Sequence, residues 1–71
     1  MNVDMIKVES SNIIAIGWAE DTLYVQYKGG LYMYEKVPEN IWEQFKAAKS
    51  KGRFMNTFVK GQYNYTKINT L

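Results

Sequence analysis

The side chains best able to do chemistry in this sequence are cations and phenols, because the chain contains neither histidine nor cysteine. Histidine is the commonest general base and metal ligand, and cysteine supplies reactive or metal-binding thiolates. No serine stands in the strand-turn-helix context of an activated nucleophile. The acids Glu20 and Asp21 fall in an expected turn, and Glu39 and Glu43 fall at an expected helix start. We therefore expect a protein that is not an enzyme, with no catalytic residues, no metal ligands and no cofactor.

The densest group of cations is the segment Lys49-Ser50-Lys51-Gly52-Arg53, which lies between two expected helical segments. Arginine can contact two phosphate oxygens at once, and lysine adds a point charge. The first amides of the second helical segment would add hydrogen-bond donors. Ser50, Lys51 and Arg53 are therefore candidate phosphate ligands. The alternative is a solvated helix end, where lysine is expected because it interacts favourably with the helix dipole.

Charge is distributed unevenly along the chain, although the net charge is only +2. Residues 1–45 hold all seven acids, whereas residues 46–71 hold six of the nine lysines and arginines and no acid. Such asymmetry favours an anionic partner. It is equally consistent with a basic end that folds over the acidic front of the same chain.

Tyrosines form the second group of candidates. The spacing Tyr-x-Tyr occurs at positions 32–34 and again at positions 63–65, where Lys60 and Lys67 lie nearby. Aromatic rings interleaved with cations suit a nucleotide, because stacking contributes about 1–3 kcal/mol per base. A plain amphipathic strand explains the same pattern. Candidate stacking or polar ligands are Ser10, Ser11, Trp18, Tyr32, Tyr34, Tyr63 and Tyr65.

The element that would position these tyrosines is a β-hairpin with a turn at Gly29-Gly30. Glycine tolerates the positive φ angles of tight hairpin turns, and a two-residue turn fixes the register of the strands. This register places Tyr27 opposite Tyr32 and Val25 opposite Tyr34. Because side chains alternate across a strand, one face becomes apolar and carries Leu23, Val25, Tyr27, Tyr32 and Tyr34.

Further elements complete a small α+β domain that spans residues 1–71. A strand over residues 13–18 adds Ile14, Ile16 and Trp18 to the apolar face. Pro38 to Lys49 has the spacing of an amphipathic helix, Arg53 to Val59 suggests a short second helical turn, and residues 63–68 read as a last strand. We expect an antiparallel β-meander of three to four strands packed by one main α-helix.

The opposite face of the sheet has no second layer to cover it. Tyr24, Leu31 and Met33 fall on that face, so we expect an exposed strip that joins subunits of a homo-oligomer. Small domains without disulfides or metals often gain stability by association. No apolar run approaches the ~20 residues of a membrane span, and the start lacks the pattern of a secretion signal, which favours the cytoplasm.

An ordered set of short motifs resembles the KTSC domain family, which is named for a segment at the C-terminus of some lysyl-tRNA synthetases. The motifs are Ser10-Ser11, Ile16-Gly17-Trp18, Leu23-x-Val25-x-Tyr27, Gly30-x-Tyr32-x-Tyr34, Val37-Pro38, Ser50-Lys51-Gly52-x-Phe54-Met55-Asn56 and Val59-Lys60-x-x-Tyr63. The resemblance runs from about Val8 to Tyr65. For this family an RNA-binding role has been suggested.

The chain also looks like phage-encoded members of this size class that act as sponges for cyclic-nucleotide immune signals, the anti-CBASS proteins. Such sponges are oligomers that bind without cleaving. This resemblance implies a nucleotide-binding viral protein of the host cytoplasm that sequesters cyclic dinucleotides, with a small anionic nucleotide as its partner. The alternatives are an RNA-binding accessory module and a purely structural oligomerisation domain.

Overall fold

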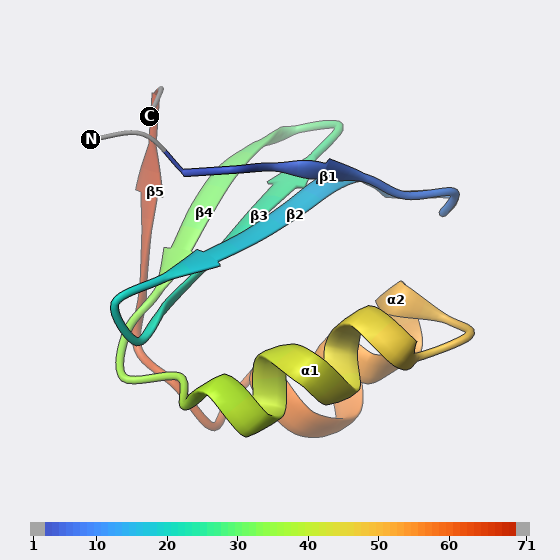
Figure 1. The fold of residues 1–71 in the computed structure, drawn as a ribbon. Helices are drawn as coiled ribbons and strands as arrows, with labels where there is room; N and C mark the ends of the chain where they lie inside the picture. The colour runs from blue at the N-terminus through green and yellow to red at the C-terminus, as the bar shows by residue number, and fades with distance from the viewer. Residues whose placement is uncertain (1–2, 70–71) are drawn as a thin grey trace.

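The computed structural model describes residues 3–69, which form one antiparallel sheet with helices on one of its faces (Figure 1). The sheet is a meander, because the order of its five strands follows the sequence. Our expectation of three to four strands is too low. A short strand near the start of the chain forms one edge of the sheet, and the predicted last strand forms the other. The strands are β1 (Ile6–Lys7), β2 (Ile13–Ala19), β3 (Thr22–Tyr27), β4 (Gly30–Tyr34) and β5 (Tyr65–Ile68).

In the sequence, the helical part comes between β4 and β5. It consists of α1 (Glu39–Ala47), α2 (Lys51–Phe54) and the π-helical turn η1 (Met55–Val59). The main helix is shorter than the predicted Pro38–Lys49, because Pro38 and Ala48 have extended backbone angles and flank it as caps. The second helical segment begins at Lys51, two residues before the predicted start. The α+β class is confirmed.

The core lies between the helices and the face of the sheet that they cover. Leu23 and Val25 of β3 are fully buried beneath Phe45 of α1 and Val59 of η1. Trp18 packs at the margin of this core, where its indole N–H donates a 2.8 Å hydrogen bond to the carbonyl of Val37. This bond joins β2 to the start of the helical part.

A β-bulge changes which isoleucine of β2 enters the core. Ile13 lies opposite Tyr27, but the next paired residue is Ala15, so one residue of β2 is left over. That residue is Ile14, whose side chain is 43% exposed, while Ile13 is only 1% exposed. The prediction that Ile14 joins the apolar face is therefore wrong, since an inserted residue inverts the alternation on one side of the bulge.

The β3–β4 hairpin keeps its predicted faces although its turn is displaced. Lys28 and Gly29 form the turn, and Gly30 already pairs with Tyr27. Val25 consequently lies opposite Tyr32, two residues from its predicted partner Tyr34. A slip of two residues preserves the side-chain alternation, so the tyrosines still share a face with Val25.

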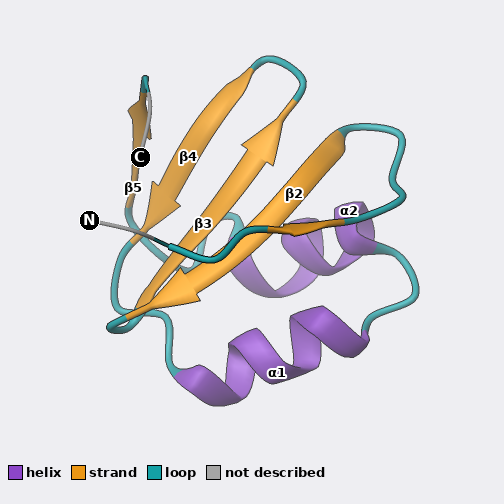
Figure 2. Ribbon diagram, turned by 45° about the horizontal axis from the view of Figure 1, so that its top comes forward, coloured by secondary structure: helices purple, strands orange, loops and turns teal. Residues whose placement is uncertain are grey.

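The other face of the sheet is covered by the chain itself, in contrast to our expectation of an exposed strip. Tyr24 and Leu31 are each only 5% exposed. The segment Val3–Met5 crosses this face (Figure 2) and lies against Gly17, where a β-carbon would be 2.6 Å from Sδ of Met5. A glycine at this point leaves room for the crossing segment. A homo-oligomer stays a prediction, but the strip that was to form its interface is largely buried within one chain.

No helix within residues 3–69 combines the length and the apolar character that crossing a membrane requires.

Candidate functional site

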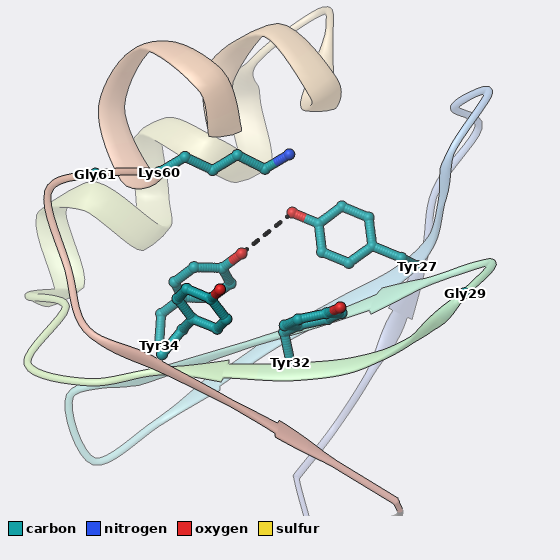
Figure 3. A pocket seen from close by; sticks show the side chains of 7 residues that line it. Tyr27, Gly29, Tyr32, Tyr34, Lys60 and Gly61 are labelled. Carbon is teal, nitrogen blue, oxygen red and sulfur yellow. Dashed lines mark hydrogen bonds between the residues drawn. The ribbon is translucent and has the colours of Figure 1, made fainter.

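An open pocket of about 510 Å³ lies at the edge of the core, between the sheet and the loop that follows η1 (Figure 3). Strand β3, the turn after it, β4, β5 and the η1–β5 loop all contribute to its walls. The residues that line it are Tyr27, Gly29, Tyr32, Tyr34, Lys60, Gly61 and Tyr65.

Strand pairing explains why four tyrosines meet here. Leu23 lies opposite Tyr34, and Tyr34 lies opposite Tyr65, so these three side chains leave the sheet on the same face. The helices cover the Leu23 end of this row, where the side chain is fully buried. At the β4–β5 end the row emerges from under them, and Tyr65 is 61% exposed. The pocket is therefore a continuation of the core face into solvent.

Tyr32 stands among the other rings. Its ring centroid is 5.3 Å from that of Tyr27, in an edge-to-face arrangement with an interplanar angle of 86°. It is 5.7 Å from the ring centroid of Tyr65, which is also 5.7 Å from that of Tyr34. These separations fall in the range of favourable aromatic pairs, which orders the cluster before any ligand arrives.

The hydroxyl groups of Tyr27 and Tyr34 face each other across the pocket at 3.4 Å, and either can be the donor (Figure 3). Burial, and then the hydrogen bond to Tyr34, raises the pKa of Tyr27 far above its ordinary value of about 10. Burial likewise raises the pKa of Tyr34. Both phenols are therefore neutral at physiological pH, and they can donate as well as accept hydrogen bonds.

Lys60 brings a positive charge to the pocket. Its Nζ atom lies 5.4 Å from the ring centroid of Tyr27, which is a cation–π distance. The π-helical turn η1 places it there: its backbone N–H donates to the carbonyl of Met55 at 2.7 Å, and Gly61 follows with a φ of +82°, a conformation that favours glycine. None of the described residues that line the pocket is acidic.

A second, shallower hollow of about 500 Å³ adjoins the first and shares Gly61 and Tyr65 with it. Polar side chains dominate it. The backbone N–H of Glu35 donates to the carbonyl of Asn64 at 2.9 Å, which ties the end of β4 to the residue before β5. The lining residues are Glu35, Gly61, Gln62, Tyr63, Asn64 and Tyr65.

Three of the predicted stacking or polar ligands meet in the first pocket, namely Tyr32, Tyr34 and Tyr65. Tyr63 lines the neighbouring hollow. Trp18 is engaged with Val37 outside both hollows. Ser10 and Ser11 lie in the connection between β1 and β2 and line neither hollow.

Two of the three predicted phosphate ligands at the basic turn, Ser50 and Lys51, serve as helix caps. The Ser50 hydroxyl accepts a 3.2 Å hydrogen bond from the backbone N–H of Arg53 at the start of α2. The Lys51 ammonium donates to the carbonyls of Lys46 and Ala48, at 3.1 and 2.5 Å, at the end of α1. Capping thus accounts for Ser50 and Lys51 without a ligand, and neither of them nor Arg53 lines the tyrosine pocket.

Sequence reasoning missed two pocket residues, Tyr27 and Lys60. Signals for both were present. Tyr27 shares its predicted face with Tyr32 and Tyr34, and Lys60 precedes the second Tyr-x-Tyr pair.

Within residues 3–69, no group of three His, Cys, Asp or Glu side chains is arranged to hold a metal ion.

The chain is similar to known proteins in both sequence and fold. The model of the KTSC domain matches residues 9–63. The crystal structure of a KTSC domain protein from Yersinia pestis is 37% identical, has a TM-score of 0.91, and covers 96% of this chain and 100% of its own.

Two sequence relatives differ in how they contain this domain. A protein of Tsukamurella paurometabola is 42% identical over 62 residues, which are 83% of this chain and 92% of that protein. A lysine–tRNA ligase of a Nostoc species is 34% identical over 67 residues, which are 90% of this chain but only 12% of the ligase. The chain thus spans a small part of the ligase and nearly all of the first relative.

Proposed function

The chain belongs to the KTSC domain family, and we propose that this member is a non-catalytic protein that binds a small anionic nucleotide in the tyrosine pocket. The observation that carries this proposal is the gathering of four tyrosine rings and the Lys60 ammonium around one open hollow of about 510 Å³. Small-molecule sites typically occupy about 300–1,000 Å³ and combine aromatic walls with a few polar groups.

Each part of a nucleotide finds a partner in this pocket. The exposed ring of Tyr65, beside that of Tyr32, offers a surface on which a base can stack. The neutral hydroxyls of Tyr27 and Tyr34 can hydrogen-bond to a base edge or a ribose. Lys60 supplies the charge that a phosphate needs.

Binding without turnover follows from the side chains that the pocket offers. A general base must accept a proton near neutral pH, and the raised pKa values of Tyr27 and Tyr34 leave both phenols protonated there. The lining residues include no carboxylate, and the sequence has no histidine or cysteine. We therefore expect the bound nucleotide to be released unchanged.

Cyclic dinucleotides are the first ligands to test, because they carry bases that can stack on the tyrosine rings and phosphates that Lys60 can contact. Isothermal titration of the full chain with cyclic di-AMP and cyclic di-GMP would compare the wild type with Tyr65→Ala and Lys60→Met. Lys7→Met is the matched control, because Lys7 lies on β1, at the edge of the sheet opposite β5.

Loss of a stacking ring should weaken binding about 5- to 150-fold in Tyr65→Ala, which corresponds to about 1–3 kcal/mol per base. Lys60→Met should also weaken it, and Lys7→Met should not. Mass spectrometry of the recovered ligand should show it intact. Equal affinity in all four proteins, or recovery of a cleaved ligand, would refute the proposal.

RNA is the second candidate ligand, and one comparison favours it. Part of a lysine–tRNA ligase is 34% identical to this chain. The same pocket could take an unpaired base of a single strand. RNA binding should weaken steeply with salt and strengthen with the length of the strand, because several phosphates release counterions together. A small nucleotide that occupies one pocket should show neither trend as strongly.

A further inference from the structure

A second cation, Lys67, lies on β5 opposite Tyr32, beside the tyrosine pocket and outside the residues that line it. Lys67 lies opposite Tyr32 in the β4–β5 ladder, and Tyr65 lies opposite Tyr34. Residues that pair directly across two strands project from the same face of the sheet. Lys67 therefore leaves β5 on the pocket side, two residues along the strand from the exposed ring of Tyr65.

Gly30 makes room for this lysine at the first residue of β4. A β-carbon at Gly30 would lie 2.6 Å from Cε and 3.4 Å from Nζ of Lys67, and 3.6 Å from Cε1 of Tyr32. The aliphatic stem of Lys67 thus crosses the bare backbone of Gly30 beside the Tyr32 ring. With any larger residue at position 30, the stem would have to move.

The two lysines reach the tyrosines from different elements. Lys60 comes from the loop after η1 and lies near the ring of Tyr27, and Lys67 comes from β5 and lies at Gly30. Gly30 is itself the pairing partner of Tyr27 across the hairpin. Within residues 3–69 neither ammonium is paired with a carboxylate, since the ion pair found there joins Lys46 and Glu43.

Two cations that lie beside the tyrosines, neither of them paired with a carboxylate of residues 3–69, favour an anion that can contact both. We propose that Lys60 and Lys67 act as a pair that selects base-bearing ligands with two phosphate groups, such as a nucleoside diphosphate or a dinucleotide, over ligands with one. This inference rests on the proposed function, because the base must stack in the tyrosine pocket for the phosphates to reach the lysines. A cyclic dinucleotide, with two phosphates, belongs to the selected class.

The experiment compares matched ligands that differ by one phosphate. The full chain would be titrated with AMP and ADP, and with GMP and GDP, at fixed ionic strength. We expect the wild type to bind the diphosphates about fivefold more tightly, the upper range for an exposed charge pair. Lys67→Met should abolish this preference while the affinity for the monophosphates stays within about twofold. Lys7→Met, which removes a charge at the far edge, should keep the preference.

Gly30→Ala provides a second variant that keeps every charge. Gly30 has a φ of +158°, so a larger residue strains the backbone there, and the added methyl group also displaces the Lys67 stem. Gly30→Ala should therefore reduce the preference for diphosphates, and its affinity for the monophosphates measures any general effect of the backbone strain. If Lys67→Met and Gly30→Ala both retain the wild-type preference while Tyr65→Ala weakens every ligand, the paired-lysine inference is wrong and the proposed pocket stands. If no nucleotide binds, or if Tyr65→Ala has no effect on any of them, both are overturned.

Discussion

Gly17→Ala should drive the N-terminal segment off the sheet. Gly17 lies in the middle of β2, on the face opposite the helices, and pairs with Tyr24. A β-carbon there would be 2.6 Å from Sδ of Met5, 2.9 Å from Cγ1 of Val3 and 3.1 Å from the carbonyl oxygen of Asp4. The thioether of Met5 can move aside, but the backbone of Asp4 moves only if the whole crossing segment shifts.

The size of the effect follows from two opposing terms. Forcing a methyl group into a filled space costs about 1–3 kcal/mol. Replacing glycine in a strand returns about 0.5–1 kcal/mol, because the unfolded chain loses conformational freedom. The net loss of unfolding free energy should be about 1–2 kcal/mol. For a domain of this size that lowers Tm by about 4–8 °C per kcal/mol.

Removal of residues 1–5 turns this estimate into a test of the contact itself. Without the crossing segment the methyl group meets nothing, so Gly17→Ala should become neutral or slightly stabilising in the shortened chain. Urea denaturation of the four proteins in this cycle should give a coupling free energy of about 1–3 kcal/mol. A coupling within 0.5 kcal/mol of zero would show that the segment does not lie against Gly17, and the reasoning would fail.

The shortened chain should also associate. Removal of residues 1–5 should uncover Tyr24 and Leu31, the apolar side chains that we had expected to be exposed. Light scattering should therefore find a larger mean mass for the chain without residues 1–5 than for the full chain at the same concentration. An unchanged mass would mean that these side chains are covered by neighbours on the sheet, and that the segment does not control their exposure.

Three further outcomes follow from the structure. Because the pKa values of Tyr27 and Tyr34 are raised in the folded protein, these phenols ionise first in the unfolded chain, above about pH 10. Their contribution to the unfolding free energy is fully present below that pH and should fall above it, by less than about 1.4 kcal/mol per pH unit for each phenol. Urea titrations should show a shallower fall for Tyr27→Phe than for the wild type. Ser50→Ala should lower the unfolding free energy by about 1 kcal/mol through loss of the helix cap and leave nucleotide affinity unchanged, whereas weaker binding in titrations would restore the basic turn as a phosphate site. The unfolding free energy of the double variant Tyr27→Phe/Tyr34→Phe should lie within about 1 kcal/mol of the wild-type value, because both partners of the hydrogen bond become apolar. Its affinity for nucleotides, measured by isothermal titration, should nevertheless be weaker.

Alternation along strands was the part of the fold most readily predicted. The face shared by Val25 and Tyr32 survives a displaced turn, because a slip of two residues does not exchange the faces of a strand. The bulge at Ile14 was not predictable in this way. Ile13 and Ile14 are the same residue type, so the pattern gives no reason to choose between them, and packing against the helices decides.

Contacts between distant segments were beyond local reasoning. Nothing in the residues around β1 indicates that Val3–Met5 lies over Gly17, since that depends on a glycine twelve residues further along. The pocket likewise depends on contacts between residues that are far apart in the sequence. Tyr65 joins Tyr34 only because β5 returns to pair with β4 after the helices, and Lys60 reaches Tyr27 only through the π-helical turn. The ingredients of the site were visible in the sequence, but their meeting was not.

The hydroxyl groups of the pocket are the feature that folding explains least. Leu23 and Val25 fill the same face of the sheet without polar atoms, and phenylalanine would pack as well as tyrosine at the margin of such a core. Tyr27 and Tyr34 instead place two hydroxyls 3.4 Å apart, and their mutual hydrogen bond uses one of two O–H donors. Both side chains line the open pocket, where the Lys60 Nζ atom lies 5.4 Å from the ring centroid of Tyr27. A surface that keeps neutral donors, acceptors and a cation around exposed rings is suited to a partner that is planar, polar and anionic, and a nucleotide has all three properties.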